Sequence, residues 1–361
     1  MKTGQAIRRG MRSYGRSLLS GSLLVCCMSC TDWIYEDRSG CDRGVYLNFR
    51  YDYNLQRADM FSDHVGGVTV YVFDADGDFV TSRSEANTAG SAPLRAKDYR
   101  MHLDLPAGEY RFVALAMQKE VAETQRGPGA KFRIAGPDGG KMEGLSVTLD
   151  HAPDGRVEHG GLPLDTLWHA MSPRSVVTSD LYAVSETLSL VRDTKYIDVV
   201  LREIDDPAGV DVADYDFRIT DRNLRLRYDN SVDESGPAVY TPYVAWNTED
   251  RTGREAAEGV GRMAHVGFMT SRILYHDRAE EDAVLTVTHR ETGREVIRVN
   301  LADMLARLRS ADELHACSEQ EFLDRGYDYR MTFFLKGDTW EAVDLEISVL
   351  NWSRRIQNVI L

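Results

Sequence analysis

The stretch Gly67-Val68-Thr69-Val70-Tyr71-Val72-Phe73 is followed by Asp74-Ala75-Asp76-Gly77-Asp78 and then by Phe79-Val80. Its β-branched and aromatic residues favour a buried strand, and an Asp-Gly pair between two apolar runs predicts a hairpin turn. The acidic stretch also resembles the opening of a calcium-binding loop. Counted from Asp74, however, the sixth residue is Phe79 and not Gly, and both flanks are strand-like, so we favour the hairpin.

Short runs of the same kind recur on both sides of this hairpin and are separated by turn residues. We expect loops over residues 118–144 and 151–164 and a helix where Leu301, Met304, Leu305 and Leu308 repeat at i, i+3, i+4 and i+7. Many short strands with regular turns indicate sandwiches, so we predict a mainly β protein with two β-sandwich domains and a short helical insertion in the second. The expected strands are 44–51, 99–105, 109–116, 145–149, 167–170, 185–190, 195–201, 216–220, 224–228, 239–243, 264–270, 283–288, 295–299, 329–335 and 342–350.

The first 30 residues have the pattern of an export signal. A basic arm precedes a short apolar core, Leu18 to Met28, which is too short to span a bilayer as a helix. A cysteine after such a core favours a lipoprotein signal, in which the thiol is acylated with palmitate-type chains and the preceding peptide is removed. Cys30 is the best candidate because the small Ser29 precedes it. The position where a lipobox usually has Leu holds Cys27, so Cys27 remains an alternative, as does an ordinary cleaved signal.

The composition of the mature chain suits an extracytoplasmic protein. Cleavage before Cys30 leaves 332 of 361 residues and removes five basic side chains, which takes the net charge from −14 to −19. So acidic a body argues against binding to nucleic acid and against adhesion to anionic lipid by charge. No later segment has enough consecutive apolar residues to span a membrane.

The sequence contains no motif that indicates catalysis, a cofactor or a metal site. The histidines are scattered, with no His-Glu-x-x-His spacing, and there is no Gly-x-Ser-x-Gly and no phosphate-binding glycine loop. Cys41 and Cys317 could pair in an oxidising compartment, but they are 276 positions apart, and two thiols are the favoured interpretation. We therefore predict that the protein is not an enzyme.

The last predicted strand, 342–350, has two interpretations. It completes its own sheet, or it pairs with another subunit by strand addition, for which an exposed β edge is a template. The candidate contacts to a partner strand are Leu345, Ile347, Val349 and Trp352.

A succession of short motifs resembles the FimB/Mfa-type fimbrial anchor lipoproteins of Bacteroidetes. Each motif alone is weak, but their order and spacing extend over nearly the whole mature chain. After the lipobox and Cys41 come Gly44-Val45-Tyr46-Leu47-Asn48-Phe49, Leu105-Pro106-Ala107-Gly108-Glu109-Tyr110, Leu167-Trp168-His169-Ala170, Phe217-Arg218-Ile219-Thr220-Asp221, Tyr228-Asp229-Asn230, Thr270-Ser271-Arg272-Ile273-Leu274, Glu321-Phe322-Leu323-Asp324-Arg325 and Asn351-Trp352-Ser353-Arg354-Arg355-Ile356-Gln357-Asn358-Val359.

The resemblance implies two tandem transthyretin-like Greek-key sandwiches, a lipid anchor in the outer membrane and a position at the base of a type V fimbrium. It also implies that pilin subunits are partners through β-strand exchange, with donor and acceptor roles left open. The expected organisation is a signal peptide (1–29), a tether (30–43), an N-terminal sandwich (44–190) and a C-terminal sandwich (191–361). The alternatives are a stalk or tip subunit of the same system and a glycan- or protein-binding surface lipoprotein of a nutrient-uptake system.

Overall fold

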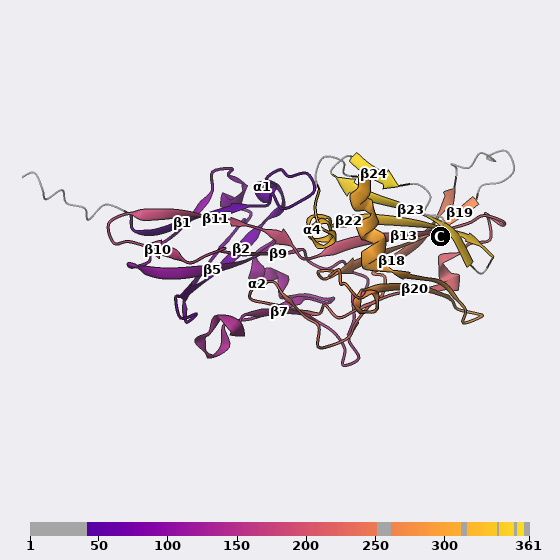
Figure 1. Cartoon of the computed structure of the whole chain (residues 1–361), viewed down its shortest axis with the longest axis horizontal. Coiled ribbons are helices and arrows are strands. Elements are labelled where there is room, and N and C mark those ends of the chain that lie inside the picture. The colour runs from indigo at the N-terminus through magenta and orange to yellow at the C-terminus, as the bar shows by residue number, and fades with distance from the viewer. Residues whose placement is uncertain (1–41, 251–260, 312–315, 338, 350–351, 357–361) are drawn as a thin grey trace, which may run out of the picture. The chain divides into compact units, whose positions relative to one another are not determined.

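The structure is a computed structural model that describes residues 42–250, 261–311, 316–337, 339–349 and 352–356. In these residues the strands form five sheets, which confirms the prediction of a mainly β protein (Figure 1). Four short α-helices are also present in the described chain: α1 (Phe61–His64), α2 (Val121–Thr124), α3 (Leu301–Ala306) and α4 (Glu319–Arg325). Single 3₁₀ turns lie at Pro93–Arg95, Asp138–Gly140, Met142–Gly144, Val212–Asp214, Ala279–Glu281 and Arg307–Ala311.

Sheets 1 and 2 pack face to face. Sheet 1 has the order β11-β1-β4, and sheet 2 has the order β12-β9-β5-β2-β3. A further strand of sheet 2, β10, pairs with β5 outside this order. Between them lies an apolar core that includes Leu47, Val70, Phe112 and Trp168, none of which is exposed. The strands are β1 (Gly44–Arg50), β2 (Gly67–Asp74), β3 (Phe79–Ala86), β4 (Arg100–Leu103), β5 (Gly108–Met117), β9 (Leu167–Met171), β10 (Val176–Thr178), β11 (Ala183–Ser189) and β12 (Val191–Arg192).

The hairpin predicted from the opening stretch is present as β2 and β3. One carboxylate oxygen of Asp74 accepts hydrogen bonds from the backbone N–H groups of Asp76 (3.0 Å) and Asp78 (2.8 Å). Gly77 has a φ of 76°, a left-handed conformation that glycine adopts without a steric cost. The acidic side chain therefore stabilises the turn through its own backbone, as expected of an Asx turn.

Sheets 3 and 4 combine strands from both sides of the predicted domain boundary. Sheet 3 has the order β16-β15-β7-β6, and sheet 4 has the order β21-β20-β14-β17-β8. The predicted loops 118–144 and 151–164 were wrong in part, because they contain β6 and β8. β6 pairs with the next strand, β7, and β8 pairs with the distant strand β17. The strands are β6 (Phe132–Ala135), β7 (Ser146–Leu149), β8 (Arg156–Val157), β14 (Tyr215–Asp221), β15 (Arg225–Arg227), β16 (Val232–Asp233), β17 (Ala238–Tyr240), β20 (Val284–His289) and β21 (Glu295–Asn300).

Sheet 5 has the order β18-β19-β13-β22-β23-β24. Buried side chains of β13, such as Val199, share a second apolar core with Ile219 of sheet 4 and with Leu115 on the outer face of sheet 2. The chain passes from β12 in sheet 2 to β13 in sheet 5 at Asp193 and Thr194. The strands are β13 (Lys195–Glu203), β18 (Val244–Asp250), β19 (Gly261–Thr270), β22 (Asp328–Lys336), β23 (Thr339–Val349) and β24 (Trp352–Ile356).

Residues Arg43–Leu361 form one unit by proximity of their Cα atoms. The predicted division into 44–190 and 191–361 stays a prediction. Sheets 3 and 4 contain strands from both of these halves.

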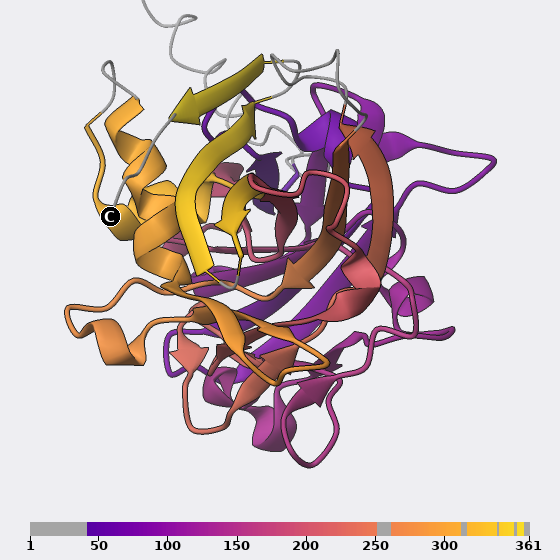
Figure 2. The same ribbon diagram turned by 90° about the vertical axis from the view of Figure 1, so that its right-hand side faces the viewer.

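The predicted helical insertion is confirmed at α3 and the 3₁₀ turn that follows it. Leu301, Met304, Leu305 and Leu308 are at most 3 % exposed, so the apolar stripe packs into the second core. The Asn300 side chain caps α3 by accepting a hydrogen bond from the N–H of Asp303 (2.8 Å). Figure 2 shows the yellow strands β23 and β24 beside this orange segment, and β24 contacts the turn Arg307–Ala311.

Candidate strand-pairing edges and a buried ion cluster

Cys30, the predicted lipidation site, and its alternative Cys27 lie outside the described residues, and so does Cys41. Cys317 is half-buried. The lipidation site and the state of the Cys41 and Cys317 thiols therefore stay predictions.

The predicted partner contacts lie on two neighbouring strands at one side of sheet 5. Leu345 and Ile347 of β23 are 0 % and 1 % exposed and pack into the second core. Their strand has a neighbour on each side, because β23 pairs with β22 and with β24. Val349 and Trp352 are opposite each other where β23 and β24 begin to pair. A partner strand can pair with β23 at Leu345 and Ile347 only if β24 first leaves the sheet.

The free edges of sheet 5 belong to other strands. Within the described ranges, β24 pairs only with β23, and β18 pairs only with β19 at the opposite side of the sheet. An edge strand presents unpaired backbone N–H and C=O groups, which another extended segment can bind. In the described chain, two edges of sheet 5 thus lack a second pairing strand. β24 begins at Trp352, which is one of the predicted partner contacts, whereas the sequence pattern did not single out β18.

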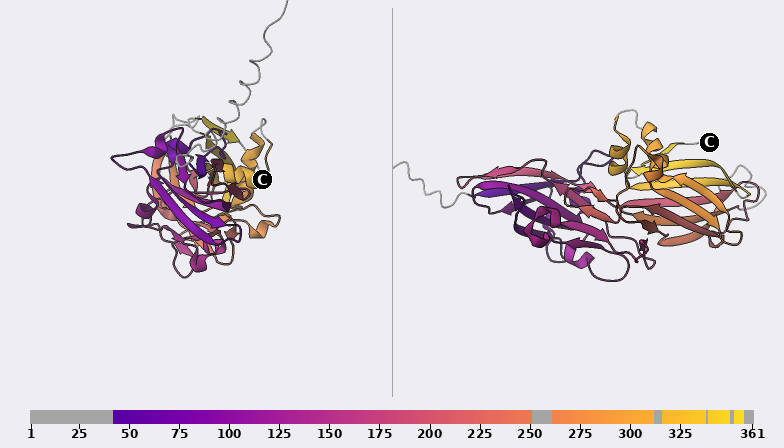
Figure 3. Two further views of the ribbon diagram at one scale, coloured as in Figure 1. Left: turned by 90° about the vertical axis from the view of Figure 1, so that its left-hand side faces the viewer. Right: turned by 60° about the horizontal axis from the view of Figure 1, so that its bottom comes forward.

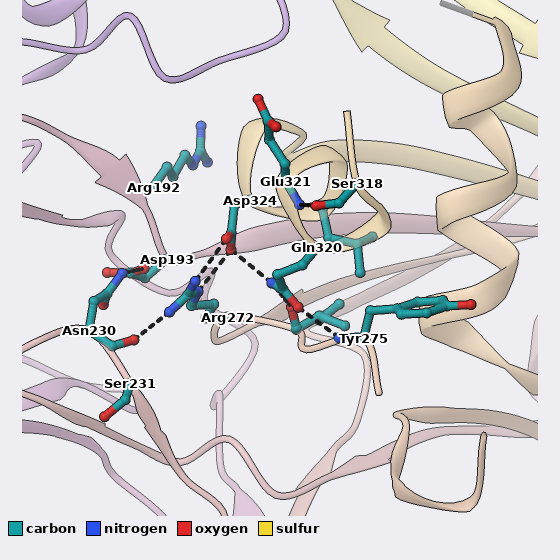
Figure 4. Close-up of polar contacts among 12 residues, drawn as sticks. Arg192, Asp193, Asn230, Ser231, Arg272, Tyr275, Ser318, Gln320, Glu321 and Asp324 are labelled. Carbon is teal, nitrogen blue, oxygen red and sulfur yellow. Dashed lines mark hydrogen bonds and ion pairs between the residues drawn. The ribbon is translucent and has the colours of Figure 1, made fainter. Parts of the chain in front are cut away.

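A buried ion pair joins the end of β19 to α4 (Figure 4). Arg272 donates to both carboxylate oxygens of Asp324, from Nε and from Nη2, each at 2.8 Å. Arg272 also donates from Nη1 to the backbone carbonyl of Asn230, and Gln320 donates from Nε2 to Asp324 Oδ1 at 3.1 Å. Burial disfavours the charge of Arg272, but the hydrogen bonds and attraction of Asp324 outweigh it and raise the pKa of Arg272.

Two further buried charges extend this cluster to the crossing between sheets 2 and 5. Asn230 donates from Nδ2 to Asp193 Oδ1 at 2.9 Å. The Lys195 ammonium donates to three backbone carbonyls, those of Arg192 (3.1 Å), Asp324 (3.1 Å) and Gly326 (2.8 Å). Burial raises the pKa of Asp193 and lowers that of Lys195, because desolvation disfavours either charge. The cluster therefore holds α4 and the segments around Asn230 and Arg272 against Asp193 and Lys195, where the chain passes from sheet 2 to sheet 5.

His169 makes a second link between the two halves of the chain. Its Nε2 bonds to the backbone carbonyl of Tyr228 at 2.8 Å, so the neutral ring donates at this nitrogen. The side chain is 5 % exposed, and burial lowers the pKa of His169 to about 4. Protonation of this ring therefore opposes the folded state.

We expect His169→Gln to weaken the loss of stability in mild acid. The unfolded histidine titrates near pH 6.5 and the folded one near 4, so the unfolded chain binds more protons in between. Stability is then lost as the pH falls from 7 to 5, by about 2 kcal/mol from this residue. Glutamine keeps an N–H donor and does not titrate, so its free energy of unfolding should change less over this range.

Denaturant unfolding at pH 7 and pH 5 measures this effect. The matched control is His151→Gln, since His151 is exposed. The control should keep the acid sensitivity of the wild type. Equal sensitivity in His169→Gln would contradict the assignment.

The described part of the chain contains no group of three or more His, Cys, Asp or Glu side chains that could hold a metal ion. Nor does any helix there have the length and hydropathy to cross a membrane. What the structure does bring together are three of the sequence motifs: Asn230, Arg272 and Asp324 come from different motifs and meet in one cluster. Asp193 and Lys195 were missed, and their only signal was a charged pair at the expected boundary.

A family model and a known relative match most of the chain. The family model described as "Fimbrillin-A associated anchor proteins Mfa1 and Mfa2" matches residues 38–358. The minor fimbrium anchoring subunit Mfa2 of Porphyromonas gingivalis is 22 % identical over 295 residues, which are 80 % of this chain and 79 % of that protein.

Solved structures are similar over nearly their whole length. A candidate adhesin from Bacteroides thetaiotaomicron is 28 % identical with a TM-score of 0.69, covering 88 % of this chain and 99 % of that one. A candidate polysaccharide-binding protein from the same organism is 27 % identical with a TM-score of 0.66, covering 89 % and 100 %. The P. gingivalis anchor Mfa2, at 17 % identity and a TM-score of 0.54 over 86 % of this chain and 98 % of that one, shares the fold.

Fold and comparisons define a class, the mainly β adhesins and fimbrial anchor proteins of the cell surface. Within that class, the chain belongs to the family of fimbrillin-A associated anchor proteins Mfa1 and Mfa2. The family resemblance inferred from the sequence motifs is thereby confirmed.

Proposed function

We propose that this protein is a non-enzymatic outer-membrane lipoprotein that holds the base of a fimbrium as its anchor or accessory subunit. The family match over residues 38–358 is the observation that carries this proposal. The lipid is attached at Cys30, or at Cys27 if the signal is cleaved three residues earlier. The pilin subunit is the protein partner, and it binds by β-strand pairing.

The β24 edge of sheet 5 is where the pilin strand pairs. Leu345 and Ile347 serve the protein's own core, so β23 is not free to accept a strand. Beyond β24, in contrast, the described chain has no further strand of sheet 5. An extended pilin segment added there gains a ladder of main-chain hydrogen bonds without disturbing the core. Val349 and Trp352, at the β23–β24 turn, lie at the end of this contact.

Deletion of residues 352–361 tests the strand-pairing proposal. It removes β24, and pilin recovered with the tagged protein from detergent-solubilised membranes should fall by about ten-fold, which corresponds to about 1.4 kcal/mol of lost binding free energy. The anchored protein itself should remain in the membrane fraction. Unchanged recovery of the pilin ladder would contradict pairing at this edge.

A reversible crosslink separates strand addition from strand replacement. Ser348 and Ser353 are opposite each other in the β23–β24 register, at the Cα spacing of an antiparallel pair. A Ser348→Cys/Ser353→Cys disulfide should hold β24 in place and leave pilin recovery unchanged. If the oxidised form loses pilin and the reductant restores it, the pilin strand replaces β24 instead. Ser348→Cys alone is the matched control.

A glycan-binding surface lipoprotein is the second candidate function. It is favoured by the similarity to the candidate polysaccharide-binding protein of B. thetaiotaomicron. Copurification distinguishes the two: an anchor is recovered with a ladder of pilin, and a glycan binder with its transporter.

A further inference from the structure

Strand β10 and its connection to β11 expose three large apolar side chains within six residues. Val177 is 69 % exposed, Leu181 58 % and Tyr182 60 %, the highest values for large apolar side chains among the described residues. We refer to these three residues as the apolar tip. Single exposed apolar residues are ordinary, but a group of three so close together indicates a contact surface.

Hydrogen bonds hold the backbone that carries the apolar tip. Thr178 donates from Oγ1 to the carbonyl of Pro106 at 2.6 Å, and Asp180 Oδ1 accepts from the N–H of Ala107 at 3.0 Å. The N–H of Leu181 donates to Ser179 Oγ at 3.1 Å. The connection is therefore fixed against the turn that precedes β5, and its side chains are presented at a defined place.

That place is next to the first residues of β1. In the parallel pairing of β1 with β11, Gly44 is opposite Ala183. Tyr182 is the residue before Ala183, so it lies next to the start of β1. Arg43 is held there as well, since its side chain bonds to Asp104 at 2.7 Å and its carbonyl to His102 at 2.8 Å. Figure 1 shows β1 and β11 on the side of the fold that lies away from the yellow strands of sheet 5, and the right-hand view of Figure 3 shows the indigo and yellow parts of the chain on opposite sides as well.

We propose that the apolar tip rests on the lipid bilayer that anchors the protein; this inference depends on the proposed lipid at Cys30. Thirteen peptide steps separate Cys30 from Arg43, so the chain reaches at most about 45 Å from the lipid to Arg43. Within that reach the bilayer is present at high effective concentration, so a small apolar contact is sufficient. Leucine, valine and an amphipathic tyrosine suit the membrane interface, and this contact needs no basic residues.

The contact also orients the body. With the apolar tip on the membrane, sheet 2 rises from the surface, because β5 runs from Gly108, opposite Thr178, to Met117, opposite Leu167. These ten residues span about 33 Å. The strands of sheet 5, including the proposed pilin edge at β24, follow beyond that far end and are directed away from the lipid.

Fluorescence quenching in vesicles tests the inference. The full-length lipidated protein, with Cys41 and Cys317 replaced by alanine, receives one cysteine, Leu181→Cys, labelled with an environment-sensitive nitrobenzoxadiazole dye. It is reconstituted into phosphatidylcholine vesicles that carry spin-labelled lipid. The matched control is Leu162→Cys, since Leu162 is 41 % exposed and lies in the segment before β9, at the far end of sheet 2.

The probe at residue 181 should be quenched at least about twice as strongly as the probe at 162. Adding Val177→Ser and Tyr182→Ser should remove the difference. Equal quenching at both positions in protein that floats with the vesicles overturns the membrane contact and leaves the lipid proposal intact. Protein that does not float with the vesicles overturns both. Shielding of residue 181 by added pilin, without lipid quenching, would assign the apolar tip to a protein partner and also overturn the inference.

Discussion

Replacing Cys30 with alanine should release this protein from the outer membrane, together with any fimbrium attached to it. The described body offers no membrane-spanning helix, and its acidic charge is not attracted to anionic lipid. With the proposed lipid anchor, attachment depends on acyl chains, which bind stably only when several act together. We expect at least about a ten-fold loss from the membrane fraction, measured by flotation and immunoblotting, with fibres recovered from the culture medium.

Cys27→Ala is the matched control for this prediction. It changes the same type of residue three positions earlier and should leave attachment unchanged. The opposite result, with Cys27→Ala released and Cys30→Ala retained, would move the lipidation site to Cys27. Retention of both variants would contradict a lipid anchor at either cysteine. Proteolysis of intact cells then shows whether the anchored body faces outward, since protection would argue against surface exposure.

Local patterns were sufficient to predict part of the fold. The β2–β3 hairpin follows from an apolar run, an Asp-Gly turn and a second run that are adjacent in the sequence. The helical stripe from Leu301 to Leu308 is likewise a local repeat, and all four of its apolar residues are buried. In both cases the residues that specify the element are also the ones that form its contacts.

Two short strands, β6 and β8, were not predictable in this way. β6 has four residues, of which only Phe132 is buried, and its partner strand β7 lies beyond a glycine-rich segment. β8 has two residues and pairs with β17, more than 80 positions later. A composition rich in Gly, Pro and charge looks like a loop whether or not another strand pairs with it.

The candidate site was predictable as separate motifs but not as an assembly. The motifs around His169, Asn230, Arg272 and Asp324 carried the family resemblance, yet no spacing rule relates residues up to 155 positions apart. The fold brings three of them into the ion cluster and joins the fourth to the adjacent Tyr228 carbonyl. For the terminal strand, alternation indicated one buried face, but only the pairing order shows that β24 and not β23 is the edge.

Arg272→Met should lower the free energy of unfolding by about 3–5 kcal/mol, the largest change we expect from a single substitution in the body. The side chains of Arg272 and Asp324 are 16 % and 7 % exposed, so the substitution leaves a desolvated carboxylate without its cation. It also removes the donor to the Asn230 carbonyl next to the crossing at Asp193. Chemical denaturation of the protein expressed without residues 1–30 measures the loss.

Arg298→Met is the matched control, since Arg298 makes the same two-point contact with Glu295, at 2.7 and 2.8 Å, on the surface. Water solvates the remaining Glu295 carboxylate, so the control should stay within about 0.5 kcal/mol of the wild type. The double variant Arg272→Met/Asp324→Leu should recover at least about 1 kcal/mol of the loss, because it removes the unpaired buried charge as well. If Arg272→Met is no more destabilising than Arg298→Met, the cluster does not hold α4 to the crossing between sheets 2 and 5. If the double variant is as unstable as the single one, the packing of Arg272, and not its charge pairing, supplies the stability.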